Sequence, residues 1–445
     1  MSGDDERPGD ERIPSSWAQR AWRTGRVALS AGRLAARQAL GTRGADLEGV
    51  AQPLVEQLDE LKGRAMKVGQ IVSYLDVPLA PEAQGALGRL QEGRRALSFE
   101  ALMEVVERSL GAPWPDLFDA IEPAPVAAAS IGQVHRGVLR GRPVAIKVRY
   151  PGVRDTFRRD LGALDRVASL ASLATQVDGR ALVRELAARL EEECDYAREA
   201  RMQAAFAHAF AHWPGLTIPA VVEDRTSDEV LTTAWEDGLD LEAFRRDAAP
   251  SVRARAGALM TTFAYEGLLV LCAVQADPHP GNFRFRADGS VVCLDFGCVR
   301  AFDDGLVQAL RGQVRSVLDD DRPAFREHTR ALGLVGDDER FDFDHFFEAS
   351  AHLYAPFRTQ PFRIDAAFAR RGYAYHGPSS PNARRLALPP AQIWIQRLQW
   401  GLWSVLGRLD ADLWLRDVLD DLLARPVRPL LGPAETVSTD GLPAP

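Results

Sequence analysis

Two aspartates and an asparagine lie close together in the second half of the chain, at residues 277–297. Asp277 is followed five residues later by Asn282, and Asp295 opens the sequence Asp-Phe-Gly thirteen residues after the asparagine. At this spacing Asn282 and Asp295 can hold magnesium on a triphosphate from opposite sides, while Asp277 orients an attacking oxygen. The pattern therefore predicts transfer of a phosphoryl group from ATP.

A lysine and a loop of small residues upstream supply the other groups that this chemistry requires. Lys147 ends the apolar run Val-Ala-Ile-Lys at residues 144–147, where its ammonium can pair with the α and β phosphates. Before it, residues 127–134 read Ala-Ala-Ala-Ser-Ile-Gly-Gln-Val, a glycine-loop pattern whose first two glycines are replaced by alanine. Small residues let the backbone approach phosphate, with less φ freedom than glycine gives. Nucleotide contacts are expected from Ala145 and from the loop residues Ala127, Ala128, Ala129, Ser130, Ile131, Gly132 and Val134.

Lys147 needs a carboxylate partner, and the segment Glu-Cys-Asp-Tyr-Ala-Arg-Glu at residues 193–199 supplies candidates. Asp195 and Glu199 are four residues apart, so they share one face of a helix. The sequence does not decide whether Glu193 or Glu199 pairs with the lysine.

Hydrophobic patterning predicts the elements that position these groups. Helical periodicity dominates residues 47–110, and short strands are expected at 126–139 and 143–150. A long helix over 182–210 and two strands around a polar turn in 217–235 follow. Beyond 241 the pattern is helical, with a buried helix at 256–276 and short strands at 283–286 and 291–294. This order predicts an α+β, bilobal, protein-kinase-like fold with a helical N-terminal extension and a mostly helical C-terminal lobe.

Four motifs make the likeness to a family specific. The extension carries Lys-x-Gly-Gln, the KxGQ motif, at residues 67–70, and the alanine-rich loop reads AAASIGQVH at 127–135. Glu193-x-Asp195, the ExD motif, and DPHPGN at 277–282 complete the set. Together these motifs resemble the UbiB family of atypical kinases, also called aarF-domain kinases. The resemblance is strong over about residues 47–302 and weaker to about 423.

The resemblance implies that the KxGQ helices form a lid over the site where a kinase would bind peptide. It places the lid's lysine against the ExD carboxylates and gives Glu199 the ion pair with Lys147, although these last two roles could be exchanged. The residues assigned in this way to the lid and its partners are Lys67, Gly69, Gln70, Glu193 and Asp195.

Two departures from the family pattern bear on catalysis. Gln275 replaces a histidine two residues before Asp277, and Ala234 replaces an acidic residue expected before an aromatic one. Neither change removes a group that touches phosphate or magnesium, so nucleotide binding is a firmer expectation than turnover.

The resemblance implies an ATP-dependent, magnesium-dependent atypical kinase or ATPase that supports isoprenoid-quinone or membrane-lipid metabolism. The alternative is a pseudoenzyme or scaffold that ATP, or ADP, only switches between conformations. An ordinary protein kinase is disfavoured, because a covered peptide cleft cannot position a foreign hydroxyl.

Composition and charge limit the classes of partner and the compartment that we expect for this protein. A formal charge of −8 over 445 residues argues against a nucleic-acid binder, and four cysteines without a CxxC pair indicate a reducing cytoplasm. The acidic start of the chain does not resemble a signal peptide. Six arginines between residues 16 and 44 suit a helix on an anionic membrane surface, with isoprenoid or quinone lipids as expected partners. A helix packed on the lobes with its arginines in solvent is the other interpretation of this segment.

The expected organisation is a disordered tail at 1–15, the basic segment at 16–46, the KxGQ extension at 47–115, an N-lobe at 116–240, a C-lobe at 241–425 and a disordered tail at 426–445. Four tryptophans of the C-lobe lie on an apolar helical pattern, which suits core packing better than a membrane or partner surface. They are Trp394, Trp400, Trp403 and Trp414.

Overall fold

The computed structural model describes residues 98–128, 131–155, 191–335, 339–376, 380–383, 385–387 and 389–432. The chain divides into two compact units, and all described residues except 152–155 belong to the unit formed by Ser98–Pro151 and Glu191–Pro445. That unit contains two hydrophobic cores, a small one in the N-lobe and a large one in the C-lobe. The KxGQ motif and the basic segment lie outside the described residues.

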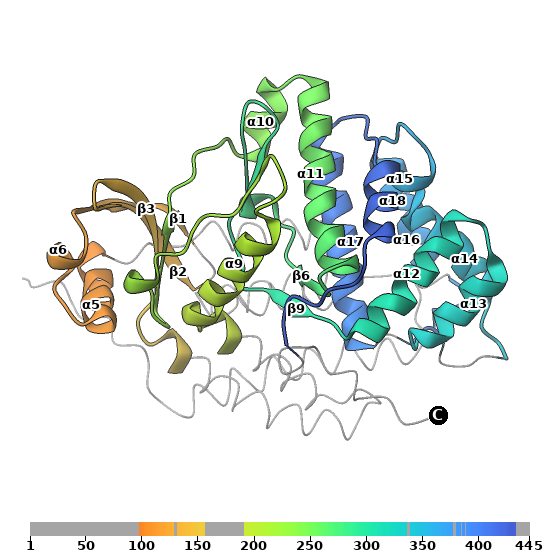
Figure 1. Ribbon diagram of the computed structural model, residues 1–445, viewed down its shortest axis with the longest axis horizontal. Coiled ribbons are helices and arrows are strands. Elements are labelled where there is room, and N and C mark those ends of the chain that lie inside the picture. Colours follow the sequence, from red (N-terminus) through yellow and green to blue (C-terminus); the bar gives the residue numbers. More distant parts are fainter. Residues whose placement is uncertain are drawn as a thin grey trace, which may run out of the picture. The chain divides into compact units, whose positions relative to one another are not determined.

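The N-lobe is built on a four-stranded antiparallel sheet in the order β1-β2-β3-β5. The strands are β1 (Ala120–Ala128), β2 (Gly132–Leu139), β3 (Arg142–Arg149) and β5 (Val230–Ala234). Residues alternate across β3, so Val144, Ile146 and Val148 join the core beneath helix α5 (Phe99–Leu110), whereas Lys147 faces the other side. Helix α9 (Tyr196–Phe210) lies on that other side (Figure 1).

The prediction of one helix through residues 182–210 is wrong at Cys194 and Asp195, which interrupt it. The Asp195 carboxylate accepts a hydrogen bond from the Arg198 amide at 2.9 Å and so forms the N-cap of α9. An aspartate at this position satisfies an amide that the first helical turn would otherwise leave unpaired. The helix that carries Glu199 therefore has a fixed start.

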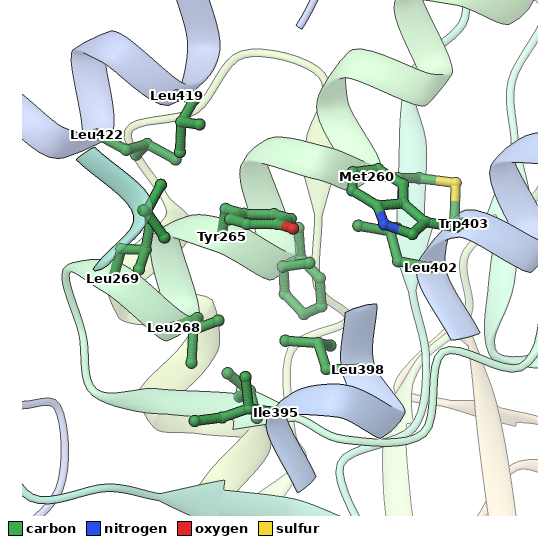
Figure 2. Close-up of a cluster of buried hydrophobic side chains, with 14 of the residues drawn as sticks. Met260, Tyr265, Leu268, Leu269, Ile395, Leu398, Leu402, Trp403, Leu419 and Leu422 are labelled. Carbon is green, nitrogen blue, oxygen red and sulfur yellow. The ribbon is translucent and has the colours of Figure 1, made fainter. Parts of the chain in front are cut away.

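The C-lobe is a bundle around helix α11 (Pro250–Leu269), which packs against α17 (Pro390–Leu409) and α18 (Arg416–Ala424). Figure 2 shows Tyr265 and Leu268 of α11 facing Leu398 and Trp403 of α17 in this core. The other helices of this lobe are α10 (Leu241–Asp247), α12 (Asp304–Leu318), α13 (Arg322–Ala331), α14 (Phe343–Leu353), α15 (Ala355–Arg358) and α16 (Ala366–His376).

Short strands place the loops of the predicted site. Strand β6 (Ala273–Gln275) pairs with β9 (Val299–Ala301), and β7 (Phe283–Phe285) pairs with β8 (Val291–Cys293). The helix expected over 256–276 therefore ends at Leu269, and its last part is strand β6. Of the two strands expected in 217–235, β4 (Leu216–Thr217) pairs with β8 rather than with β5.

Three further expectations concern the tryptophans of the C-lobe, the end of the chain and membrane-spanning helices. Trp394 and Trp403 are buried in the core, whereas Trp414 is 57% exposed. Residues 427–432, expected to belong to a disordered tail, are ordered, because Arg428 and Leu430 donate backbone hydrogen bonds to Val270 and Leu271. Within the described part of the chain, no helix is long and apolar enough to cross a membrane.

Candidate active site

The centre of the site is an ion pair between the sheet and helix α9. The Lys147 ammonium donates to both carboxylate oxygens of Glu199, at 2.6 and 2.9 Å. Asp295, two residues beyond β8, brings its Oδ2 to 3.5 Å from the same nitrogen. Of the carboxylates that the sequence left open, Glu199 is thus the one that contacts the lysine.

The charges of this cluster depend on its burial. Burial alone would lower the pKa of Lys147, but the neighbouring carboxylates of Asp295 and Glu199 outweigh it and hold that pKa well above its usual range. Burial raises the pKa of Glu199 to about 7, against the opposing effect of the lysine. Burial also raises the pKa of Tyr196, whose ring lies 4.9 Å from the ammonium. Lys147 is therefore a permanent cation at physiological pH.

The segment between β6 and β7 is held by hydrogen bonds to Asp277. Asn282 donates its amide nitrogen to the Asp277 backbone carbonyl at 2.9 Å and to Oδ2 of its side chain at 3.4 Å. Gln275 donates to the same carbonyl at 2.8 Å. His279 accepts from the Gly281 amide at 3.0 Å, so it stabilises the turn. The amide nitrogen of Asn282 thus faces Asp277 and leaves its oxygen available as a ligand.

A cavity of about 310 Å³ lies beside Lys147, Glu199, Asn282 and Asp295, whereas Asp277 is not among the residues that line it. Of the residues predicted to contact nucleotide or metal, eight line it: Ala127, Ala128, Val134, Ala145, Lys147, Glu199, Asn282 and Asp295. Its other walls include the β5 end, Thr233 and Ala234, and the following Trp235 and Glu236. These groups provide an apolar slot next to a cluster of charges, which suits a base and its phosphates.

The remaining loop residues have different surroundings. Ile131 is buried, and Gly132 lies so close to β3 that a Cβ there would be 2.2 Å from the Val148 carbonyl oxygen. Neither of the two lines the cavity, and Ala129 and Ser130 fall outside the described residues. Glycine at 132 is therefore required by the close approach of two strands.

The donors present fit magnesium bound with a nucleotide. Within the described ranges, no group of three or more histidine, cysteine, aspartate or glutamate side chains could hold a metal. Magnesium, however, commonly takes one or two protein oxygens and completes its shell with phosphates and water. Asn282 and Asp295 line the same cavity and offer oxygens of this kind. When bound, the ion would neutralise charge on the phosphates.

The predicted contact between lid and ExD motif stays a prediction. Lys67, Gly69 and Gln70 lie outside the described residues. Asp195 caps helix α9, and this hydrogen bond accounts for one of its carboxylate oxygens.

Several polar residues of the site, among them Gln203, Arg284 and Arg397, were not predicted from the sequence. Gln203 and Arg284 line the cavity, and Arg397 of α17 binds Asp277. Gln203 follows Glu199 by one helical turn, a spacing that could have indicated it. Arg397 is 120 residues from Asp277, and no sequence signal connects the two.

The fold and site define a kinase-like protein with lysine, glutamate, aspartate and asparagine around one cavity. Residues 89–329, more than half of the chain, match the family described as the ABC1 atypical kinase-like domain. The chain belongs to this family of UbiB and aarF-domain atypical kinases, as the motifs predicted.

Relatives and a solved structure agree with this assignment. The mitochondrial atypical kinase COQ8B of Rattus norvegicus is 29% identical over 385 residues, covering 85% of this chain and 72% of the relative. The mitochondrial atypical kinase COQ8 of Saccharomyces cerevisiae is 26% identical over 83% of this chain and 75% of the relative. The chain spans only 39% of the mitochondrial atypical kinase coq-8 of Caenorhabditis elegans, at 30% identity.

The solved structure of Rv3197 from Mycobacterium tuberculosis, a complex with erythromycin, has a TM-score of 0.65 and 27% identity to this chain. The match covers 85% of this chain and 98% of the Rv3197 chain. This likeness supports the predicted α+β bilobal kinase-like fold.

Proposed function

We propose that this protein binds ATP with magnesium and transfers its γ-phosphoryl group, to water or to another acceptor. The observation that carries the proposal is the Lys147–Glu199 ion pair at 2.6 Å, with Asp295 3.5 Å from the same ammonium and Asn282 lining the same cavity. Phosphoryl transfer requires this combination of fixed cation and metal-binding oxygens.

The chain's own residues divide the work between binding and orientation. Lys147 pairs with the α and β phosphates, and Glu199 fixes its position. Asp277 orients the attacking oxygen, which forms a bond to the γ-phosphorus while the bond to the β,γ-bridging oxygen breaks. When the nucleophile is water, its proton passes to Asp277 and then to solvent, and ADP leaves with the bridging oxygen. Asn282 and Asp295 would hold magnesium on the phosphates.

We also propose that the protein acts at a membrane. The family resemblance supports a role in isoprenoid-quinone or membrane-lipid metabolism, and the arginines of residues 16–44 suit contact with an anionic surface. On these two grounds we propose a peripheral position on the inner face of a membrane. Stimulation of ATP hydrolysis by anionic liposomes would support this part of the proposal.

Asp295→Asn tests the site. The amide keeps the side chain's shape and removes the metal-binding charge, so we expect magnesium-dependent ATP affinity to fall at least about tenfold, since even outer-shell partners of metal ligands contribute that much. Isothermal titration with ATP, with and without magnesium, measures this affinity. Asp420→Asn on the exposed face of α18 is the matched control.

Unchanged magnesium-dependent affinity in Asp295→Asn would reject the assignment of the site. Steady-state ATP hydrolysis by the wild-type chain, measured with and without liposomes, distinguishes the enzyme from the alternative, a scaffold that is only switched by nucleotide. A chain that binds magnesium and ATP but hydrolyses none under either condition rejects transfer to water and favours the scaffold.

A further inference from the structure

Helix α17 reaches the proposed catalytic aspartate from far along the chain. Arg397 donates from Nη2 to Asp277 Oδ1 at 2.8 Å and from Nε to the Ala276 carbonyl oxygen at 3.1 Å. One guanidinium thus binds both the side chain and the adjoining backbone of the loop. Both side chains are mostly shielded, with 21% of Arg397 and 32% of Asp277 exposed.

The position of the guanidinium is fixed by packing on either side of it along the helix. One turn later, Gly401 lies so close to Pro278 that a Cβ would come within 2.5 Å of the proline Cγ. One turn earlier, the Trp394 ring lies 5.9 Å from the Arg397 guanidinium and 4.7 Å from that of Arg300. Arg300 is in turn paired with Glu192 at 2.7 Å. These contacts, one turn before and one turn after Arg397, therefore hold its guanidinium beside the loop.

The contact gives the two carboxylate oxygens of Asp277 different surroundings. Oδ1 receives the strong, charge-assisted hydrogen bond from Arg397, whereas Oδ2 has the longer 3.4 Å contact with Asn282. The segment 277–282, Asp-Pro-His-Pro-Gly-Asn, contains no lysine or arginine of its own. The cation beside Asp277 is thus supplied by a helix that lies beyond the family match at 89–329.

We infer that Arg397 is a positioning residue for phosphoryl transfer, holding Asp277 by Oδ1 so that Oδ2 is directed to the attacking oxygen. This inference rests on the proposed function and extends the active site to helix α17. Arg397 contacts Asp277 and does not line the cavity, so we expect it to act through Asp277. Its loss should therefore reduce the turnover number and leave nucleotide affinity in place.

Three variants test the inference by steady-state ATP hydrolysis and nucleotide titration. Arg397→Gln should lower kcat by about tenfold to a hundredfold, because small misplacements of a catalytic group have effects of this size. The affinity for ATP with magnesium should stay within about twofold. Arg397→Lys should retain part of the rate, and added guanidinium ion should restore part of it to Arg397→Ala. Arg408→Gln on the same helix, which loses only an exposed pair with Glu242, is the control.

A double-mutant cycle separates positioning from structural damage. If Arg397 acts through Asp277, Arg397→Gln should have little further effect on the residual rate of Asp277→Asn. Wild-type kcat in Arg397→Gln, additive effects in the cycle, or equal losses of kcat and affinity without guanidinium rescue would each overturn the inference. These outcomes presuppose wild-type hydrolysis, whereas a wild-type chain that binds ATP but hydrolyses none overturns transfer to water and, with it, this inference.

Discussion

At the scale of residues, Glu199 determines how the site responds to protons. Its side chain is only 4% exposed and its partner Lys147 lies at 2.6 Å. Burial raises the pKa of the carboxyl to about 7, so the group gains a proton close to neutral pH. An ionised Glu199 holds the ammonium in place, and a protonated one holds it less firmly.

We therefore expect ATP affinity to fall as the pH is lowered from 8 to 6, by roughly tenfold, the effect of losing a hydrogen bond to a charged group. Glu199→Gln should bind ATP more weakly at pH 8, and its ATP affinity should lack the fall between pH 8 and 6 that is due to the carboxyl.

The same carboxyl affects folding stability in the opposite sense. Because the folded-state pKa is raised, the stability that the Glu199 carboxyl contributes is present below its ordinary pKa of 4.5 and is lost as the pH rises through about 7. Affinity and this part of the stability thus change in opposite directions, and titration and thermal unfolding of both chains measure them.

Identical pH profiles of affinity in the wild type and in Glu199→Gln would contradict this role. Titration of the nucleotide itself affects both chains equally, so the difference between the two profiles reports the carboxyl alone.

At the scale of elements, the N-lobe sheet, helices α9 and α17 and the short strands β6, β7 and β8 bring the site together. The sequence allowed Asp277, Asn282 and Asp295 to be predicted, because each lies beside a short apolar strand at a spacing that metal binding requires. It could not indicate Arg397, since this arginine lies in a mostly apolar helix whose orientation depends on packing. Likewise, the choice of Glu199 depended on the start of α9 at Asp195, a local interruption that helical periodicity conceals.

Gly401→Ala tests whether close packing of α17 on the loop matters for catalysis. The added Cβ would lie 2.5 Å from Pro278 Cγ, so the loop must shift even though alanine favours the helix by about 1 kcal/mol. We expect kcat to fall by roughly tenfold while ATP affinity changes little. Ser404→Ala, at an exposed position of the same helix, should leave both unchanged. Wild-type kcat in Gly401→Ala would show that the loop accommodates the methyl group without loss of geometry.

At the scale of the whole molecule, the order of motifs predicted the two lobes, because each motif marks one part of a kinase-like fold. Composition was a poorer guide to the end of the chain. Residues 426–432 are rich in proline, yet Val427, Leu430 and Leu431 pack against the large core. Just before them, Arg425 pairs at 2.8 Å with Glu266, a carboxylate buried in α11. A few apolar side chains and one buried charge were enough to order this segment.

The contribution of this segment to the free energy of unfolding can be measured by comparing a chain that ends at Gly432 with one that ends at Pro426. The shorter chain loses the backbone hydrogen bonds from Arg428 and Leu430 and the burial of two leucines. We expect its free energy of unfolding to be lower by about 2–4 kcal/mol, combining roughly 1 kcal/mol for each hydrogen bond with partial burial of the side chains. Chemical denaturation measures the difference, and replacing Leu430 and Leu431 by serine in the full chain should reproduce much of it. ATP affinity should be the same in all these chains, because none of the altered residues lines the cavity. Equal unfolding of the two truncated chains would mean that the ordered segment adds nothing to the core on which it lies.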